Sequence, residues 1–185
     1  MELFLDTVNI AAIKDLNKTL TIDGVTTNPS ILSASKRNPF DVINAIIEIL
    51  EPNQKLFVEV MANNCDDMVK EAAFINGLRE NCYAKIPVSF ESLKAIKICK
   101  EREYKTLATA IFTSTQAYLA AKNGADYLAP YVNRMNMYLD GIDETIKLQN
   151  VIWNNGFKSK VVAASFKEVE QIKQLMNSVA TIEWE

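Results

Sequence analysis

The chain has 185 residues, with 20 basic and 23 acidic side chains and no histidine. The missing histidine excludes the commonest general base, the commonest metal ligand and every pairing of a serine or cysteine nucleophile with histidine. The net charge of -3 gives no electrostatic case for binding nucleic acid or an anionic membrane. A small phosphorylated substrate stays possible, because it needs only a few cations placed locally.

Cysteine usage and the first residues indicate a cytoplasmic protein. Cys65, Cys82 and Cys99 are far apart and odd in number, so we expect reduced thiols and no zinc site. An acidic residue interrupts the first apolar run, Met1–Asp6, so we expect no signal peptide. No stretch approaches the ~20 apolar residues of a membrane span. The composition, 49% hydrophobic and 23% charged, predicts one globular domain over residues 1–185.

Short apolar runs alternate with longer amphipathic runs along the chain. Eight runs are predicted to be strands: Glu2–Asp6, Ile22–Thr26, Lys55–Val60, Cys82–Ile86, Thr106–Ala110, Ala125–Pro130, Lys160–Ala164 and Val179–Glu183. Seven stretches between them have helical spacing: Asn9–Leu20, Phe40–Leu50, Asp66–Leu78, Ser89–Arg102, Ser114–Lys122, Asp140–Asn154 and Phe166–Asn177. Several strands are apolar throughout, which is typical of parallel strands covered on both faces. The pattern predicts an α/β protein with a parallel (β/α)8 TIM barrel.

An open doubly wound sheet is the alternative architecture. It is disfavoured because no Gly-x-Gly-x-x-Gly follows a predicted strand, and the chain has only five glycines. Barrels with eight strands usually take ~250 residues. Since the last predicted strand ends at Glu183, we expect a barrel truncated after strand eight, with the C-terminal helices missing. Such a barrel would expose apolar surface beside its first and last strands.

Polar side chains stand at the C-terminal ends of seven predicted strands, where the active sites of such barrels form. They are Asp6, Thr26 to Asn28, Glu59, Lys85, Thr109, Tyr131 with Asn133 and Arg134, and Ser165 with Lys167. Each has an ordinary alternative. The first could cap a helix, the threonines and asparagine could form a turn before Pro29, and the cations could be solvated loop charges. Their coincidence at one rim favours a shared site.

Lys85 is the sharpest of these signals. It lies in the apolar strand Cys82–Ile86, and a buried lysine is rare unless it is paired or functional. Desolvation favours the neutral amine, so we expect a lowered pKa and a nucleophile toward carbonyl groups. The alternative is a lysine that snorkels from an edge strand. Glu59 is a lone carboxylate in its strand; it can exchange a proton with Lys85 through water if it points inward, or pair with a helix if it points outward.

Five motifs together resemble the small transaldolases and fructose-6-phosphate aldolases. They are Leu5-Asp6-Thr7, Gly24-Val25-Thr26-Thr27-Asn28-Pro29-Ser30, Lys85-Ile86-Pro87, Ala129-Pro130-Tyr131-Val132-Asn133-Arg134 and Ala163-Ala164-Ser165-Phe166-Lys167, in the family's order. The likeness runs from Met1 to about Ile182. It implies a class I aldolase on a (β/α)8 barrel, without a metal or other cofactor, that acts on a small phosphorylated sugar.

The resemblance implies catalytic roles for several rim residues. Lys85 matches the lysine that forms a Schiff base with the C2 ketone of a ketose phosphate. Asp6 matches the carboxylate that takes the proton from the C4 hydroxyl during cleavage between C3 and C4. Glu59 and Thr109 match residues that hold a proton-shuttling water. The chemistry agrees with the residue types, since a lysine nucleophile, carboxylates and water need no imidazole.

The remaining rim residues match the substrate-binding positions of the family. Asn28 matches a group that binds the hydroxyls of the dihydroxyacetone unit, and Thr26 is assigned to the same part of the site. Arg134, Ser165 and Lys167 match the phosphate site, which agrees with the preference of phosphate for local cations and hydroxyls.

Two positions distinguish the family's two activities, and they point in opposite directions. Glutamate at position 59 is similar to the transaldolases, whereas the aldolases have glutamine there. Tyrosine at position 131 is similar to the aldolases, whereas the transaldolases have phenylalanine. A phenol near the water can help to protonate the enamine, and Leu107–Arg134 also resembles the aldolases, so fructose-6-phosphate aldolase is the favoured activity.

Two alternatives stay open beside the aldolase. The first is a transaldolase of the pentose phosphate pathway, which transfers the dihydroxyacetone unit between sugar phosphates. The second is a truncated, non-catalytic family member. The family's ring-like assemblies also imply a homo-oligomer if the C-terminus permits one.

Overall fold

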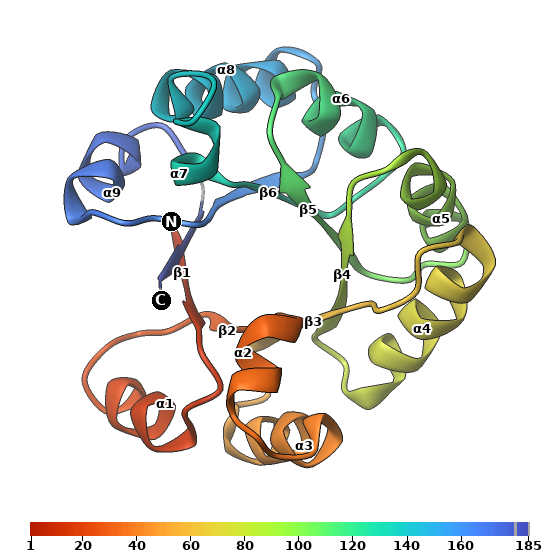
Figure 1. Cartoon of the computed structure of the whole chain (residues 1–185), viewed down its shortest axis with the longest axis vertical. Helices are drawn as coiled ribbons and strands as arrows, with labels where there is room; N and C mark the ends of the chain where they lie inside the picture. The colour runs from red at the N-terminus through yellow and green to blue at the C-terminus, as the bar shows by residue number, and fades with distance from the viewer. Residues whose placement is uncertain (180, 185) are drawn as a thin grey trace.

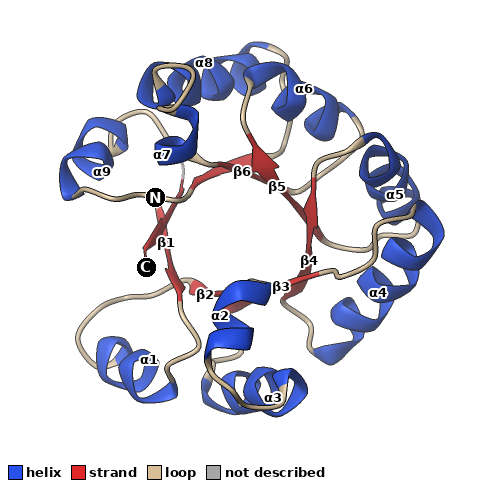
Figure 2. Cartoon of the chain, in the orientation of Figure 1, coloured by secondary structure: helices blue, strands red, loops and turns tan. Residues whose placement is uncertain are grey.

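The computed structural model describes residues 1–179 and 181–184, and within them eight parallel strands close into one barrel in sequence order. Helices surround the ring of strands (Figures 1 and 2). The strands are β1 (Glu2–Asp6), β2 (Gly24–Thr26), β3 (Lys55–Glu59), β4 (Cys82–Pro87), β5 (Thr106–Ile111), β6 (Tyr127–Pro130), β7 (Lys160–Ala163) and β8 (Thr181–Trp184). The helices are α1 (Ile10–Asn17), α2 (Pro29–Ala34), α3 (Pro39–Ile49), α4 (Cys65–Leu78), α5 (Phe90–Glu101), α6 (Ser114–Lys122), α7 (Val132–Met135), α8 (Gly141–Asn154) and α9 (Val169–Leu175). The predicted (β/α)8 class is confirmed.

Aromatic rings fill the middle of the barrel interior. Phe57 lies 4.9 Å from Phe4 and 5.0 Å from Tyr83, measured between ring centroids. Tyr127 completes the group at 5.3 Å from both Phe57 and Tyr83. Such tilted and edge-to-face pairs add about 0.5–1.5 kcal/mol each beyond the burial of their area. Because side chains alternate along each strand, the interior faces of these strands continue upward to the polar residues at the rim.

A charged network closes the barrel below these rings. The carboxylate of Glu2 lies 2.6 Å from the ammonium of Lys55 and 3.3 Å from that of Lys160. It also accepts hydrogen bonds from the hydroxyls of Tyr127 and Thr181, each at 3.2 Å. Burial acts to raise the pKa of Glu2, but the two lysines outweigh it and hold the pKa below its usual value. The N-terminal end of the barrel is therefore filled and ion-paired.

Side-chain caps decide where the helices begin. The side-chain oxygen of Asn9 accepts a hydrogen bond from Ala12 N at 3.2 Å, so α1 starts at Ile10. This excludes the alternative in which Asp6 caps that helix. The described helices lack the combination of length and apolar composition that a helix needs to cross a lipid bilayer.

Two short helices, α2 and α7, were not predicted. With six and four residues they are too short to show a helical period in the sequence. The helix α2 begins because Asn28 caps it and Pro29 occupies its first position. In Figure 1 both helices lie nearer the ring of strands than α3 and α8 do. They therefore border the C-terminal rim, where candidate site residues lie.

Seven of the eight predicted strands differ from the observed ones by one or two residues at an end, and three of them, β2, β6 and β8, begin two residues later than expected. The second strand was expected over Ile22–Thr26 but begins at Gly24, because the side-chain amide of Gln54 bonds to the carbonyl oxygen of Ile22 at 2.9 Å. The last strand was expected over Val179–Glu183 and is found at Thr181–Trp184, while position 180 lies outside the described residues.

The last described helix is shorter than its pattern predicts. A helix was expected over Phe166–Asn177, yet α9 begins at Val169. The side-chain oxygen of Gln171 accepts hydrogen bonds from the backbone of Lys167 at 2.9 Å and of Glu168 at 3.3 Å. This capping interaction ends the extended segment and starts the helix three residues later than expected.

A pair of glycine substitutions tests the packing of the barrel. A Cβ atom on Gly24 would lie 2.2 Å from the carbonyl oxygen of Lys55 in the neighbouring strand, whereas one on Gly77 of α4 meets nothing within 4 Å. We expect Gly24→Ala to lower the free energy of unfolding by about 3 kcal/mol, because backbone atoms must move. Gly77→Ala should raise it by about 0.5–1 kcal/mol through better helix propensity. Urea denaturation measures both, and equal effects would contradict this account.

Candidate active site

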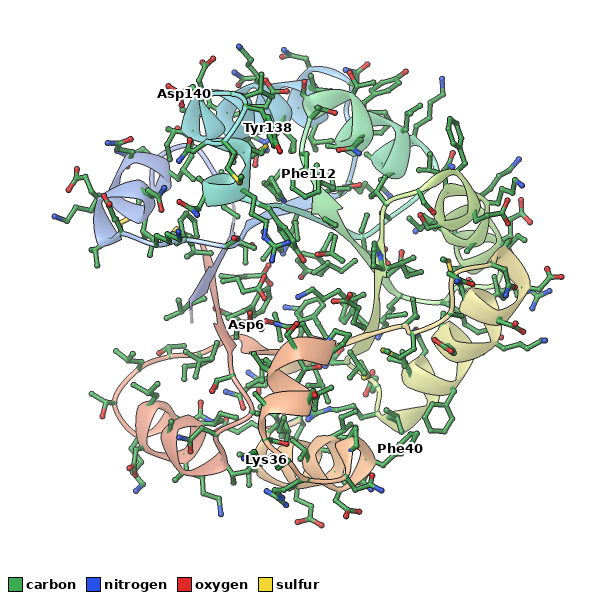
Figure 3. The ribbon with its side chains drawn as sticks, viewed as in Figure 1. Asp6, Lys36, Phe40, Phe112, Tyr138 and Asp140 are labelled. Atoms are coloured by element: carbon green, nitrogen blue, oxygen red, sulfur yellow. The ribbon has the colours of Figure 1, made fainter. Side chains whose placement is uncertain are left out.

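A cavity of about 400 Å³ opens at the C-terminal ends of the strands. Predicted site residues that line it are Asp6, Asn28, Glu59, Lys85, Tyr131, Arg134 and Ser165. Asp6 lies at the inner wall of the barrel in Figure 3. The cavity also has a lining residue that was not predicted, Glu183 of β8. Strands β1, β3, β4 and β8 and the short helix α7 thus each contribute a charged side chain to one space.

Lys85 lies inside the barrel with 2% of its surface exposed. Its ammonium nitrogen is 3.3 Å from Glu183 Oε1 and donates to the carbonyl oxygen of Thr27 at 3.4 Å. β4 pairs with both β3 and β5 in the closed barrel, so it is not an edge strand. The alternative of a lysine that snorkels from an edge is therefore excluded.

The predicted lowering of the pKa of Lys85 is wrong. Burial does act to lower this pKa, as expected, but the carboxylate of Glu183 opposes it, followed by Asp6, Tyr131 and Glu59. Together these groups raise the pKa of Lys85 above its usual value. The error arises because the sequence interpretation counted desolvation and missed the carboxylate beside the amine. In the resting site Lys85 is an ammonium ion held by an ion pair.

Three residues from β1, β2 and the loop after β2 form a hydrogen-bonded group. The hydroxyl of Thr26 lies 2.8 Å from Asp6 Oδ1 and also contacts Glu183 Oε1. The side-chain amide of Asn28 donates to Asp6 Oδ2 at 3.3 Å, and its oxygen accepts from Ile31 N at 3.0 Å. Asn28 therefore caps α2 and orients Asp6 at the same time. A structural role of Asn28 in the turn before Pro29 is therefore compatible with a role in the candidate site.

The position of Glu59 answers the question that alternation left open. It follows the interior residue Phe57 by two positions, so it shares the inward face of β3 and lines the cavity. It pairs in register with Lys85 on β4. In β5, the hydroxyl of Thr109 donates to the phenol oxygen of Tyr131 at 3.1 Å. Thr109 is fully buried and thus contacts the cavity through Tyr131.

Arg134 and Ser165 both line the cavity. The guanidinium carbon of Arg134 is 5.1 Å from the ring centroid of Tyr131, a cation–π distance that holds the charge beside this cavity residue. Ser165 follows β7. Lys167 is exposed, its backbone bonds to Gln171, and it is not among the residues that line the cavity. The structure thus brings two of the three predicted phosphate-site residues to the cavity.

Two cavity residues adopt left-handed backbone conformations that side chains disfavour. Ala110 has φ +53° and Ser165 has φ +60°. The pairing of β5 with β6 shifts register between Ala108 and Ile111, and Ala110 lies in this interval. Such conformations cost about 1–3 kcal/mol each and cluster at functional sites. A bulge at this point redirects the side chains that follow Thr109, so the strain supports a functional assignment of the rim.

A sequence profile of the transaldolase/fructose-6-phosphate aldolase family matches residues 3–183. The chain belongs to this family. Its members are enzymes of the class I aldolase and transaldolase type that act on phosphorylated sugars. The family match covers every rim residue discussed above and all eight strands except the first residue of β1 and the last residue of β8.

A solved structure with a similar fold is that of L-talarate dehydratase from Polaromonas sp. JS666 complexed with Mg and L-glucarate. The TM-score is 0.67 and the sequence identity 11%, over 100% of this chain and 53% of that one. The chain therefore spans about half the length of that protein. At this identity the likeness concerns the barrel fold alone.

Glu183 is the residue of this transaldolase-family site that the sequence interpretation missed. The sequence contained a signal for Glu183: it is a lone carboxylate in an apolar strand, and the same argument had selected Glu59. It was not applied to β8, where Glu183 follows Ile182 and is 3% exposed. Although several acidic side chains meet here, no three His, Cys, Asp or Glu side chains in the described part of the chain are arranged to hold a metal ion.

The pKa of Glu59 gives a test of the site's electrostatics. Burial raises this pKa above its usual 4.5, the carboxylate of Glu183 raises it further, and Lys85 offsets part of the effect. A raised carboxyl pKa means that ionisation costs more in the folded state, so the fold loses stability as pH rises from below 4.5. We expect Glu59→Gln to raise the free energy of unfolding at about pH 7 and to leave it unchanged at about pH 4.

Urea denaturation at the two pH values measures this difference. Glu48→Gln, which neutralises an exposed carboxylate on α3, is the matched control and should show no such gain. A Glu59→Gln variant that is less stable than the parent chain at neutral pH would show that attraction to Lys85 outweighs burial.

Proposed function

We propose that the chain is a class I aldolase that cleaves or forms fructose 6-phosphate through a Schiff base on Lys85. The observation that carries the proposal is a buried lysine that lines a cavity together with three acidic side chains and an arginine. Family membership supports the reaction type. The products of cleavage are dihydroxyacetone and glyceraldehyde 3-phosphate.

The first half of the mechanism makes the imine. The neutral amine of Lys85 attacks the C2 ketone, and water leaves as the iminium ion forms. Asn28, at the wall of the cavity, binds the hydroxyls of the dihydroxyacetone unit. Arg134 and Ser165, which line the cavity, bind the phosphate at the other end of the sugar. Lys167 contributes to this phosphate site if its exposed side chain turns toward the cavity.

Cleavage follows when a base takes the proton from the C4 hydroxyl. Asp6 serves as this base, since its carboxylate is oriented by Thr26 and Asn28. The C3–C4 bond breaks, the aldehyde forms on the leaving fragment, and the electron pair moves into an enamine on Lys85. Protonation of the enamine at C3 and hydrolysis of the imine then release dihydroxyacetone.

The fate of the enamine distinguishes an aldolase from a transaldolase. Tyr131, hydrogen-bonded to Thr109, supports protonation by a water at the cavity wall, and this favours the aldolase. Glu59 favours the second candidate, a transaldolase that hands the enamine to another aldose phosphate, because the transaldolases of the family have glutamate there. Its raised pKa fits a group that holds a proton near the imine.

Replacement of the nucleophile tests both enzymatic candidates. Lys85→Met should abolish the adduct that borohydride traps with fructose 6-phosphate and should abolish turnover, because methionine cannot form an imine. Mass spectrometry of the intact protein measures the adduct. Lys97→Met, at an exposed position of α5, is the control and should keep both. An adduct that persists in Lys85→Met would refute the assignment. If the parent chain forms no adduct, both enzymatic candidates are refuted and the non-catalytic family member is the alternative that stays.

Removal of one hydroxyl separates the aldolase from the transaldolase. Tyr131→Phe should lower the release of free dihydroxyacetone relative to transfer onto erythrose 4-phosphate by about tenfold or more, since positioned proton transfer contributes about 10²–10⁴ in rate. Tyr118→Phe, on the outer helix α6, is the control. An unchanged ratio would contradict the role of Tyr131. Product that forms only with the acceptor, without free dihydroxyacetone, would identify a transaldolase.

A further inference from the structure

Glu183 combines burial with contact to the amine of Lys85. Its carboxylate is 3% exposed, and Oε1 lies 3.3 Å from the nitrogen of Lys85 and contacts the hydroxyl of Thr26. The other oxygen, Oε2, has no hydrogen-bond partner among the described residues. Glu183 also lines the cavity, so a substrate in the cavity lies within reach of this carboxyl group.

The hydroxyl of Thr26 connects Glu183 to a second carboxyl group, that of Asp6. A hydroxyl has one hydrogen to donate, yet the oxygen of Thr26 lies 2.8 Å from Asp6 Oδ1 and also contacts Glu183 Oε1. The hydroxyl can therefore donate to only one of these two carboxyl oxygens at a time. Thr26 thus holds both carboxyl groups near the amine of Lys85.

We propose that Glu183 is a catalytic residue of imine formation, which carries protons from the nitrogen of Lys85 to the carbonyl oxygen of the substrate. This inference rests on the proposed function, since it requires Lys85 as the nucleophile. Thr26 is a positioning residue that contacts Oε1 beside the amine, and Glu183 lines the cavity that would hold the carbonyl.

The protons balance through two transfers. The Lys85 ammonium gives one proton to the Glu183 carboxylate, and the neutral amine forms the bond to C2. The protonated Glu183 returns this proton to the former carbonyl oxygen, which becomes the hydroxyl of the carbinolamine. Glu183 then takes a second proton from nitrogen and gives it to that hydroxyl, which leaves as water. The iminium nitrogen keeps one hydrogen, and Glu183 ends as a carboxylate.

Substitution by glutamine separates this role from that of a passive counter-ion. Glu183→Gln keeps the size and hydrogen bonds of the side chain but cannot accept a proton. If Glu183 carries protons, the rate at which fructose 6-phosphate forms a borohydride-trappable adduct falls by about 100-fold at neutral pH. If Glu183 only holds Lys85 as an ammonium ion, its loss frees the amine, and adduct formation keeps its rate or accelerates. Either of the latter results overturns the proposal.

Controls distinguish failure of this inference from failure of the proposed function. Glu183→Gln should fold, because a buried lysine without its anion loses its proton instead of staying charged; thermal unfolding checks this. Glu183→Asp keeps the charge but withdraws the carboxylate, so adduct formation should slow while substrate affinity stays unchanged. An unchanged rate in this variant also overturns the proposal. Absence of an adduct in the parent chain overturns the proposed function and this inference together, whereas normal adduct formation in Glu183→Gln overturns the inference alone.

Discussion

A lysine that stays charged inside a barrel needs an anion beside it, and Lys85 has Glu183 at 3.3 Å. Desolvation alone would release a proton from the lysine, but the carboxylate keeps it as an ammonium ion. The rest of the rim is arranged around this pair. Thr26 connects it to Asp6, Glu59 is destabilised as an anion by the same burial, and the substrate-facing side of the cavity stays open toward Arg134.

Barrel closure is what brings these residues together. Lys85 and Glu183 are 98 positions apart in the sequence, and Thr26 and Glu183 are 157 apart. The pairing of β8 with β1 carries Glu183 to the side of the barrel where β1 and β2 end. Because strand pairing fixes the height at which each strand ends, the polar side chains at these ends lie close together without depending on any one loop. Local strain at Ala110 and Ser165 then adjusts where two of the loops leave the barrel.

The sequence predicted the barrel and much of its rim, for identifiable physical reasons. Apolar runs indicate buried parallel strands even when the neighbouring strands are unknown. The alternation of such runs with helical patterns was therefore enough to predict the fold class. Asp6 was found because it ends a strand, and Lys85 because a charged side chain stands out in an apolar strand. The direction of Glu59 could be assigned only once Phe57, two positions earlier in the same strand, was known to point into the barrel. The sign of the pKa change of Lys85 depends on Glu183, which belongs to a strand far away in the sequence. The helices α2 and α7 were missed because they are too short to show a period.

The ring of aromatic side chains and the Glu2 network give the barrel a solid floor. In the part of the chain that the structure describes, the candidate cavity therefore lies at the C-terminal rim, next to an interior that side chains fill. In the mechanism proposed above, the departing aldehyde and any acceptor sugar use this same space of about 400 Å³. The first aldehyde then has to leave before a second sugar arrives, and water and the second sugar compete for the enamine at one place.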